Sequence, residues 1–295
     1  MSRINEIIES AVNNVKGNKS GFDVEKWAQE KNEKRKWAYK TQDEMSRKII
    51  ENVDFYKAYL DIQSKFTNYS VGNTLLIMAQ NSKAAQLKDV EGWKRDNINF
   101  ARKPTPIIIL EPSNIYERED GMDVQGYDTK KVYDISDMKV KRKINTISYT
   151  SENIMRAILS IAPVQVEVIK NTVNDKLVNY NANRRIIEVS EKAEVEEIIQ
   201  GLIREIASIK LLTFKQSELN NFKNESISYM ISKRYGLPTN NYSFEKIPEE
   251  LKQMTPKEIK SELGKSVECA EIIIDDMSKY IETHLKNKIN KEYER

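Results

Sequence analysis

The chain has few side chains that could act as nucleophiles or metal ligands. It contains one histidine, His284, and one cysteine, Cys269, among 295 residues. Zinc sites and most hydrolytic triads use histidine as a ligand or a base, and His284 is followed by Lys286 and Lys288, as on a solvated helix face. We therefore expect no metal, no cofactor and no catalytic residue. A lone cysteine cannot form an internal disulfide, which fits a reducing cytoplasm.

The net charge permits nucleic-acid binding but does not demand it. Residues 1–150 have 26 basic and 22 acidic side chains and the remainder has 22 and 23, which gives +3 overall. This asymmetry is weaker than that of a dedicated duplex-binding domain. No apolar stretch approaches the roughly 18 residues of a membrane span, and the first residues lack an apolar signal region. We expect a cytoplasmic protein without a membrane partner.

Hydrophobic spacing predicts the elements of the first 145 residues. Apolar residues at three- and four-residue steps indicate helices, and a dense β-branched run indicates a central strand. The predicted elements are helices over 4–15, 42–66 and 69–81, a strand over 106–110 closed by Glu111-Pro112, and a strand over 131–137. The first 40 residues offer many charges and few apolar anchors, so we expect a charged helical arm.

The remaining residues predict a small sheet surrounded by helices. The expected elements are a helix over 154–159, a meander of strands over 164–168, 173–180 and 185–190, and helices over 193–212 and 255–285. Thr255-Pro256-Lys257-Glu258 supplies an N-cap, a proline at the first helical position and a capping-box glutamate. The predicted fold class is α+β, a helix-rich protein of two domains.

Four segments of the first half resemble a known domain. Asn73 to Gln80 follows the pattern Asn-x-x-Leu-Ile-x-x-Gln, and Gly92-Trp93, a strand at Ile107–Pro112 and a strand at Lys131–Asp137 follow in order. Together they resemble the N-terminal domain of the ArdC antirestriction family, which implies binding of single-stranded DNA. The family's glycine-lysine turn before the central strand is replaced here by Ala101-Arg102-Lys103-Pro104.

The second half is similar to the zincin-like metallopeptidase domain of ArdC and of LtrC-like proteins from conjugative elements. The matching segments are Arg185–Ser190, Ile199–Ser208, Glu225–Tyr229 and Gly236-Leu237. The resemblance covers roughly residues 42–285. It implies an ArdC N-terminal-like DNA-binding domain over 41–145 and a degenerate zincin-like domain over 146–295, which follow the charged helical arm predicted over 1–40.

The resemblance places Arg204-Glu205-Ile206-Ala207-Ser208 where a zincin has its His-Glu-x-x-His zinc motif. Arginine stays protonated and serine is a poor zinc ligand, whereas Glu205 matches the general base and Glu225 the third ligand. We therefore expect a pseudoenzyme with a degenerate zinc site. Two alternatives stay open for Arg204: it takes the place of the metal and pairs with Glu225 or Glu205, or it faces solvent.

Single-strand binding needs cations along the phosphates and aromatic rings that stack on bases. Near the family motif, the candidates are Tyr69, Asn73, Trp93, Lys94, Arg95, Arg102 and Lys103. Each has a structural alternative: Trp93 as a core anchor, the cations as solvated charges, and Asn73 with Gln80 as partners for buried backbone. The run Lys34–Trp37, with Tyr39 and Lys40, is a second basic-aromatic candidate or a wet helix face.

The leading functional hypothesis is a single-stranded-DNA-binding accessory protein of a plasmid, conjugative transposon or phage. The family resemblance adds protection of incoming DNA from restriction. The main alternative is a protein–protein interaction module, with an inactive peptidase fold that binds a protein of the conjugation or phage machinery. An active metallopeptidase is the third alternative.

Overall fold

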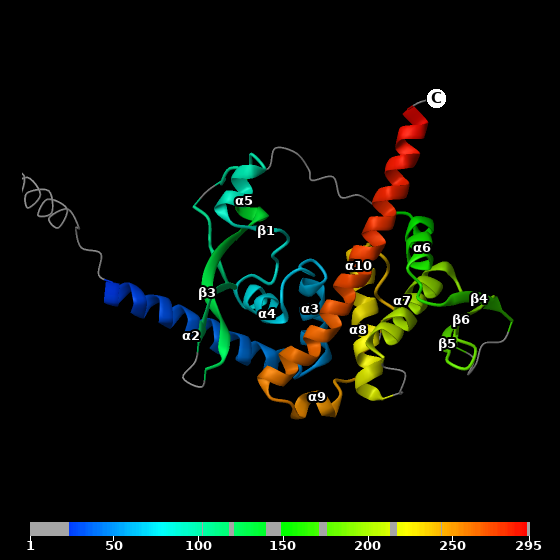
Figure 1. Cartoon of the computed structure of the whole chain (residues 1–295), viewed down its shortest axis with the longest axis horizontal. Coiled ribbons are helices and arrows are strands. Elements are labelled where there is room, and N and C mark those ends of the chain that lie inside the picture. The colour runs from blue at the N-terminus through cyan, green and yellow to red at the C-terminus, as the bar shows by residue number, and fades with distance from the viewer. Residues whose placement is uncertain are drawn as a thin grey trace, which may run out of the picture. The chain divides into compact units, whose positions relative to one another are not determined.

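The structure is a computed structural model that describes residues 24–101, 103–117, 121–139, 149–170, 176–212, 217–242 and 244–293, with side chains up to residue 284. Helices and two small sheets alternate along the chain (Figure 1), which confirms the predicted α+β class. Two compact units are present: Met1–Tyr39 with Leu110–Lys130, and Lys40–Ile109 with Lys131–Arg295. The predicted helix over 4–15 lies outside the described residues.

The first unit contains the start of helix α2 (Val24–Ile49) and the distal parts of strands β2 (Ile107–Glu117) and β3 (Asp123–Asp134). Lys31 Nζ lies 2.6 Å from one carboxylate oxygen of Asp128, and Arg35 Nη1 lies 3.5 Å from the other. The described part of the expected charged arm is thus a regular helix. Its basic stretch is partly neutralised by an acidic strand residue.

Strand β2 is longer than the sequence predicts. We expected it to end at Glu111-Pro112, but it continues to Glu117. That expectation was wrong because β2 is an edge strand of its sheet, whose order is β1-β3-β2. Proline is tolerated at an edge, where its missing N–H removes no ladder hydrogen bond.

In the second unit, Gln80 ties helix α4 (Val71–Gln80) to the start of β2. Its side-chain amide donates to the Ile108 carbonyl and accepts from the Ile108 N–H, both at 2.8 Å. The same amide group donates to the Leu76 carbonyl at 2.8 Å. Gln80 therefore satisfies backbone, the alternative that the sequence left open for it. Strand β1 (Leu87–Lys88) pairs antiparallel with β3 on the other side, and α5 (Val90–Arg95) and the 3-10 turn η1 (Ile135–Asp137) follow these strands.

The single helix expected over 42–66 is divided in two. Helix α2 ends at Ile49 and helix α3 (Val53–Gln63) begins after Asn52. Asn52 is extended, and its side chain accepts a hydrogen bond from the Phe55 N–H at 3.0 Å. An asparagine in this position satisfies an otherwise unpaired N–H group and starts a new helix.

The second sheet is mixed rather than a meander. Its strands are β4 (Gln165–Ile169), β5 (Val178–Asn181) and β6 (Ile186–Ser190), in the order β4-β6-β5. Strand β4 pairs parallel with β6, and β5 pairs antiparallel with β6. The expected meander was wrong because β6, buried along its whole length, takes the centre. Fully buried positions favour a strand with neighbours on both sides.

The described residues of the second half also form the helices α6 (Ser151–Ser160), α7 (Val195–Leu211), α8 (Glu218–Arg234), α9 (Glu249–Gln253) and α10 (Pro256–Tyr293). The predicted capping box at the start of α10 is confirmed. The Thr255 N–H donates to the Glu258 carboxylate at 2.8 Å, and the Glu258 N–H donates to the Thr255 hydroxyl at 3.3 Å.

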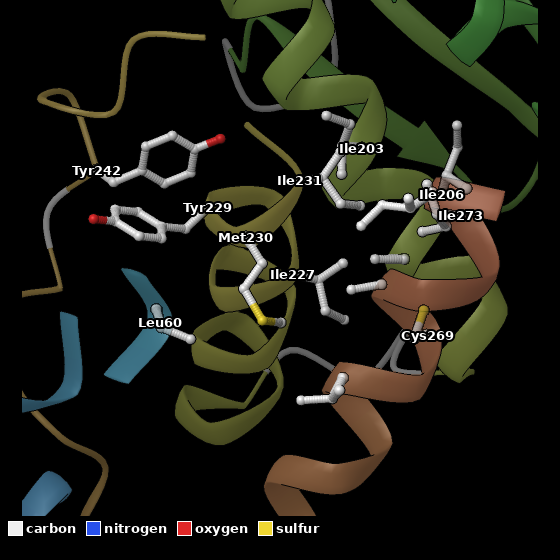
Figure 2. Packing of buried hydrophobic residues seen from close by; sticks show 14 of the residues in the cluster. Leu60, Ile203, Ile206, Ile227, Tyr229, Met230, Ile231, Tyr242, Cys269 and Ile273 are labelled. Carbon is white, nitrogen blue, oxygen red and sulfur yellow. The ribbon is translucent and has the colours of Figure 1, made fainter. Parts of the chain in front are cut away.

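One hydrophobic core joins helices from both halves of the sequence. It contains Tyr56 and Leu60 of α3 together with Ile203, Ile227 and Ile273 of the later helices, and Figure 2 shows part of this packing. The Tyr56 hydroxyl lies 2.8 Å from the hydroxyl of Ser226 on α8 inside this core. The predicted domain boundaries near residues 40 and 145 stay predictions.

We predict that Gln80→Leu lowers the free energy of unfolding by roughly 1–3 kcal/mol. The backbone N–H and carbonyl of Ile108 would both lose their hydrogen bonds to the Gln80 side chain. Gln253→Leu on exposed helix α9 is the control and should change it little. Chemical denaturation of both variants checks the difference. Equal stability of the two would show that the Gln80 amide contributes no net hydrogen-bond energy.

Candidate functional site

A polar pocket of about 490 Å³ lies in the second unit between β5, α7 and α8. The four positions expected to form the degenerate zinc site, Arg204, Glu205, Ser208 and Glu225, all line it. Residues 204 and 208 are one helical turn apart on α7, and Glu225 faces them from α8. The remaining lining residues are Lys176, Leu177, Val178, Asn179, Tyr180, Ala182, Asn221 and Asn224.

Arg204 forms an ion pair across the pocket. Its Nη1 lies 3.3 Å from Oε2 of Glu225, and the two side chains are 37% and 25% exposed. Arg204 thus contacts Glu225, one of the two partners that the sequence left open, while its side chain remains partly exposed to solvent. Because both groups retain contact with water, the pair contributes little to stability, but it commits the Glu225 carboxylate to a cation supplied by the chain.

Glu205 is held by the neighbouring strand instead. Its Oε2 accepts a hydrogen bond from the Tyr180 N–H of β5 at 3.1 Å. Burial raises the pKa of Glu205 above its usual value, and this outweighs the opposing effects of the Tyr180 N–H, Lys176 and Arg204. Glu205 is therefore a carboxyl group that the protein environment biases toward its protonated form.

These donors do not suit a transition metal. Arginine has no free lone pair, and a serine hydroxyl is a weak ligand. The two carboxylates are engaged by Arg204 and by the Tyr180 N–H. Within the described parts of the chain, no group of three or more His, Cys, Asp or Glu side chains is arranged to hold a metal ion.

The sequence did not identify the two pocket asparagines. Asn221 and Asn224 come from α8, and Asn224 is only 8% exposed. Asn221 precedes Glu225 by one helical turn, so helical spacing from Glu225 could have placed it at the same site. Their amides make the pocket a mixed surface of hydrogen-bond donors and acceptors.

The nucleic-acid candidates divide by burial. Trp93 is 1% exposed and its Nε1–H donates to the Tyr133 carbonyl at 3.0 Å. Because its faces are enclosed, Trp93 is a core anchor in this structure and is not placed to stack on a base. Tyr69 is half-buried with its ring edge-on to Phe66 at a centroid distance of 5.8 Å, and half-buried Asn73 donates its N–H to Ser70 at 3.3 Å in the α4 cap.

Lys94 and Arg95 are exposed at the end of helix α5, and Lys103 is exposed in the loop before β2. Lys94 pairs with Glu91 at 3.0 Å, with both side chains more than 60% exposed. Arg102 lies outside the described residues. Asp137 fixes the loop that carries Lys103, because its carboxylate accepts the Thr105 N–H at 3.1 Å.

The comparisons with solved structures show the fold. The Mn(II)-bound structure of the antirestriction protein ArdC from plasmid R388 matches with a TM-score of 0.53 and 12% identity, covering 81% of this chain and 97% of that one. The metal-free structure of the same protein matches with a TM-score of 0.47 and 12% identity, covering 72% and 86%. The chain matches no protein-family model and no curated protein. Thus the expected ArdC-like fold is confirmed at the level of architecture.

We predict that Glu205→Gln stabilises the chain above neutral pH. A raised pKa means that the folded chain holds this proton more tightly than the unfolded chain, so ionisation at higher pH costs folding free energy. Glutamine cannot ionise, and its side-chain oxygen can still accept from Tyr180. The gain should be roughly 0.5–2 kcal/mol at pH 8 and should vanish toward pH 4.

Denaturation of the native chain, Glu205→Gln and the exposed control Glu191→Gln across this pH range measures the effect. A Glu205→Gln advantage that is equal at pH 4 and pH 8, or present in the control, would contradict it.

Proposed function

We propose that this chain binds single-stranded DNA as an accessory protein of a mobile genetic element and helps to protect incoming DNA from restriction. The fold shared with an antirestriction protein of plasmid R388 supports the antirestriction role. The observation that carries the DNA-binding part is the group of exposed cations Lys94, Arg95 and Lys103 on the module that the sequence relates to the ArdC N-terminal domain.

The backbone around these cations is fixed, which favours a preformed binding surface. The Lys139 N–H donates to the Asn99 carbonyl at 2.7 Å, and the Ala101 N–H donates to the Asp137 carbonyl at 2.8 Å. Exposed Lys139 is therefore held beside the loop that carries Lys103. Cations on a fixed backbone lose less conformational entropy on binding phosphates than cations on a disordered segment.

We also infer that the zincin-like half is a pseudoenzyme. The similar ArdC structure is described as Mn(II)-bound, but the donor set here does not fit a metal. The positively charged Arg204 lies against Glu225, and a cation in the same space would be repelled.

Restoring the missing ligands tests whether the pocket has peptidase-like geometry. We predict that the double variant Arg204→His, Ser208→His binds about one Zn²⁺ per chain, because imidazoles at i and i+4 on α7 would face Glu225. Binding should weaken below pH of about 6.5, where histidine becomes protonated. Elemental analysis and competition with a chromogenic chelator measure zinc.

The matched control is Arg204→Gln, Ser208→Ala, which changes the same positions without adding ligands. If the histidine variant retains no more zinc than this control, α7 and α8 do not hold a zincin-like arrangement.

DNA binding is tested with a fluorescent oligothymidylate of about 30 nucleotides. We predict that the chain binds this oligonucleotide and that binding weakens steeply with salt, because phosphate neutralisation releases counterions. A competing duplex of equal length should displace the oligonucleotide only weakly. Neutralising Lys94, Arg95 and Lys103 to glutamine should reduce affinity at low salt by about tenfold or more. The control neutralises the exposed lysines Lys170, Lys192 and Lys257.

Absence of binding by the native chain at low salt would overturn the proposed function. Equal loss of affinity in both triple variants would show that net charge, rather than the position of Lys94, Arg95 and Lys103, determines the affinity.

A further inference from the structure

Two long segments of the chain contain no acidic residue. Residues 62–88 and 226–244 have neither aspartate nor glutamate, in a chain with 45 acidic residues among 295. Segments of this length would each be expected to hold several. Both contain basic residues, and no acidic residue within these segments offsets the positive charges of Lys65, Lys83, Lys233 and Arg234.

The fold brings these two segments together along α3 and α8. Arg234, the last residue of α8, directs its Nη1 to the Lys65 carbonyl just after α3 at 3.5 Å. Lys233 Nζ lies 3.0 Å from the carboxylate of Asp61 on α3. The Tyr229 hydroxyl donates to the same carboxylate at 2.7 Å, and Figure 2 shows Tyr229 on α8 near the α3 ribbon that carries Leu60.

Lys57 completes a strip of cations. It lies one turn before Asp61 on α3, with its Nζ 5.8 Å from the centroid of the Tyr229 ring, and Lys233 Nζ lies 5.6 Å from the same centroid. We call Lys57, Lys65, Lys233 and Arg234 the α3–α8 cation strip. Three of them are exposed and Lys57 is half-buried.

The strip is held in place by internal contacts. The Lys65 ammonium donates to the Ala84 carbonyl at 3.3 Å, a neutral acceptor that leaves its charge intact. The Asp61 carboxylate contacts the strip, and it shares its charge between Lys233 and the Tyr229 hydroxyl. The strip therefore keeps a net positive charge on a preorganised surface.

A half-buried tyrosine, Tyr69, lies in the same acid-free segment as Lys65. Tyr69 follows Lys65 by four residues in the same acid-free segment, and the Gln63 amide, at the end of α3, donates to its carbonyl at 3.0 Å. This contact fixes the backbone of Tyr69 next to the C-terminal end of α3. Cations with an adjacent tyrosine match the backbone phosphates and bases of a single strand.

We propose that the α3–α8 cation strip is a second contact for single-stranded nucleic acid, with phosphates on the four cations and a base against Tyr69. This inference rests on the proposed function and extends it, because α8 belongs to the zincin-like half. That half then supplies part of the nucleic-acid surface, beyond any role as a scaffold.

The test measures anisotropy of the same oligothymidylate over a salt series. The strip variant changes Lys57, Lys233 and Arg234 to glutamine and leaves Lys65, which anchors Ala84, unchanged. Each lost phosphate contact lowers the steepness of log K against log salt by about 0.7. We expect a loss of roughly 2 in slope, while the Lys170, Lys192 and Lys257 control keeps the native slope.

The variant Asp61→Asn should change the affinity in the opposite direction, which distinguishes an effect of charge from an effect of misfolding. It removes the strip's negative charge while its amide can still bond Tyr229, so we expect several-fold tighter binding at low salt, which a damaged fold would not produce. If the native chain binds, but the strip variant has the same salt slope as the control and Asp61→Asn binds no tighter, the proposed role of the strip is wrong and the proposed function stands. If the native chain does not bind, both fail.

Discussion

The ion pair between Arg204 and Glu225 determines the chemistry available to the pocket between α7 and α8. A guanidinium carries a positive charge in proteins, so Glu225 faces a cation supplied by the chain itself. Glu205, the other carboxyl group, is turned to the Tyr180 N–H and biased toward its protonated form. Both acids therefore have internal partners, and the pocket offers hydrogen bonds rather than a site for a cation.

Much of this arrangement follows from sequence, because the relevant residues are local. Helical spacing places positions 204 and 208 on one turn, and the chemistry of arginine and serine argues against zinc without any coordinates. The capping residues at Thr255 and Glu258 also act within a few residues, so the start of α10 was predicted correctly. Several features set by near neighbours in sequence were accessible, although the local cap at Asn52 that divides α2 from α3 was missed.

Features set by distant neighbours were not. Strand order in the second sheet depends on which strand is buried on both sides, and β6 takes that place. The Tyr133 carbonyl, which accepts a hydrogen bond from the Trp93 indole, lies 40 residues away in the sequence. The sequence therefore left open whether Trp93 packs in the core or stacks on a base. Asp61 was overlooked entirely, because its partners Tyr229 and Lys233 are more than 160 residues away.

Helix α8 links the pocket to the cation strip. Glu225 lies in its first half, and Tyr229, Lys233 and Arg234 follow toward its end, so the residues of both surfaces are positioned by one element. Two serines between Glu225 and Tyr229 make hydrogen bonds inside the core: Ser226 with Tyr56, and Ser228 with Tyr242. These bonds fix the rotation of the helix about its axis. A rotation that displaced Glu225 from Arg204 would also move Lys233 from Asp61. The packing that pairs Arg204 with Glu225 is therefore the same packing that orients Lys233, so both surfaces depend on the position of one helix.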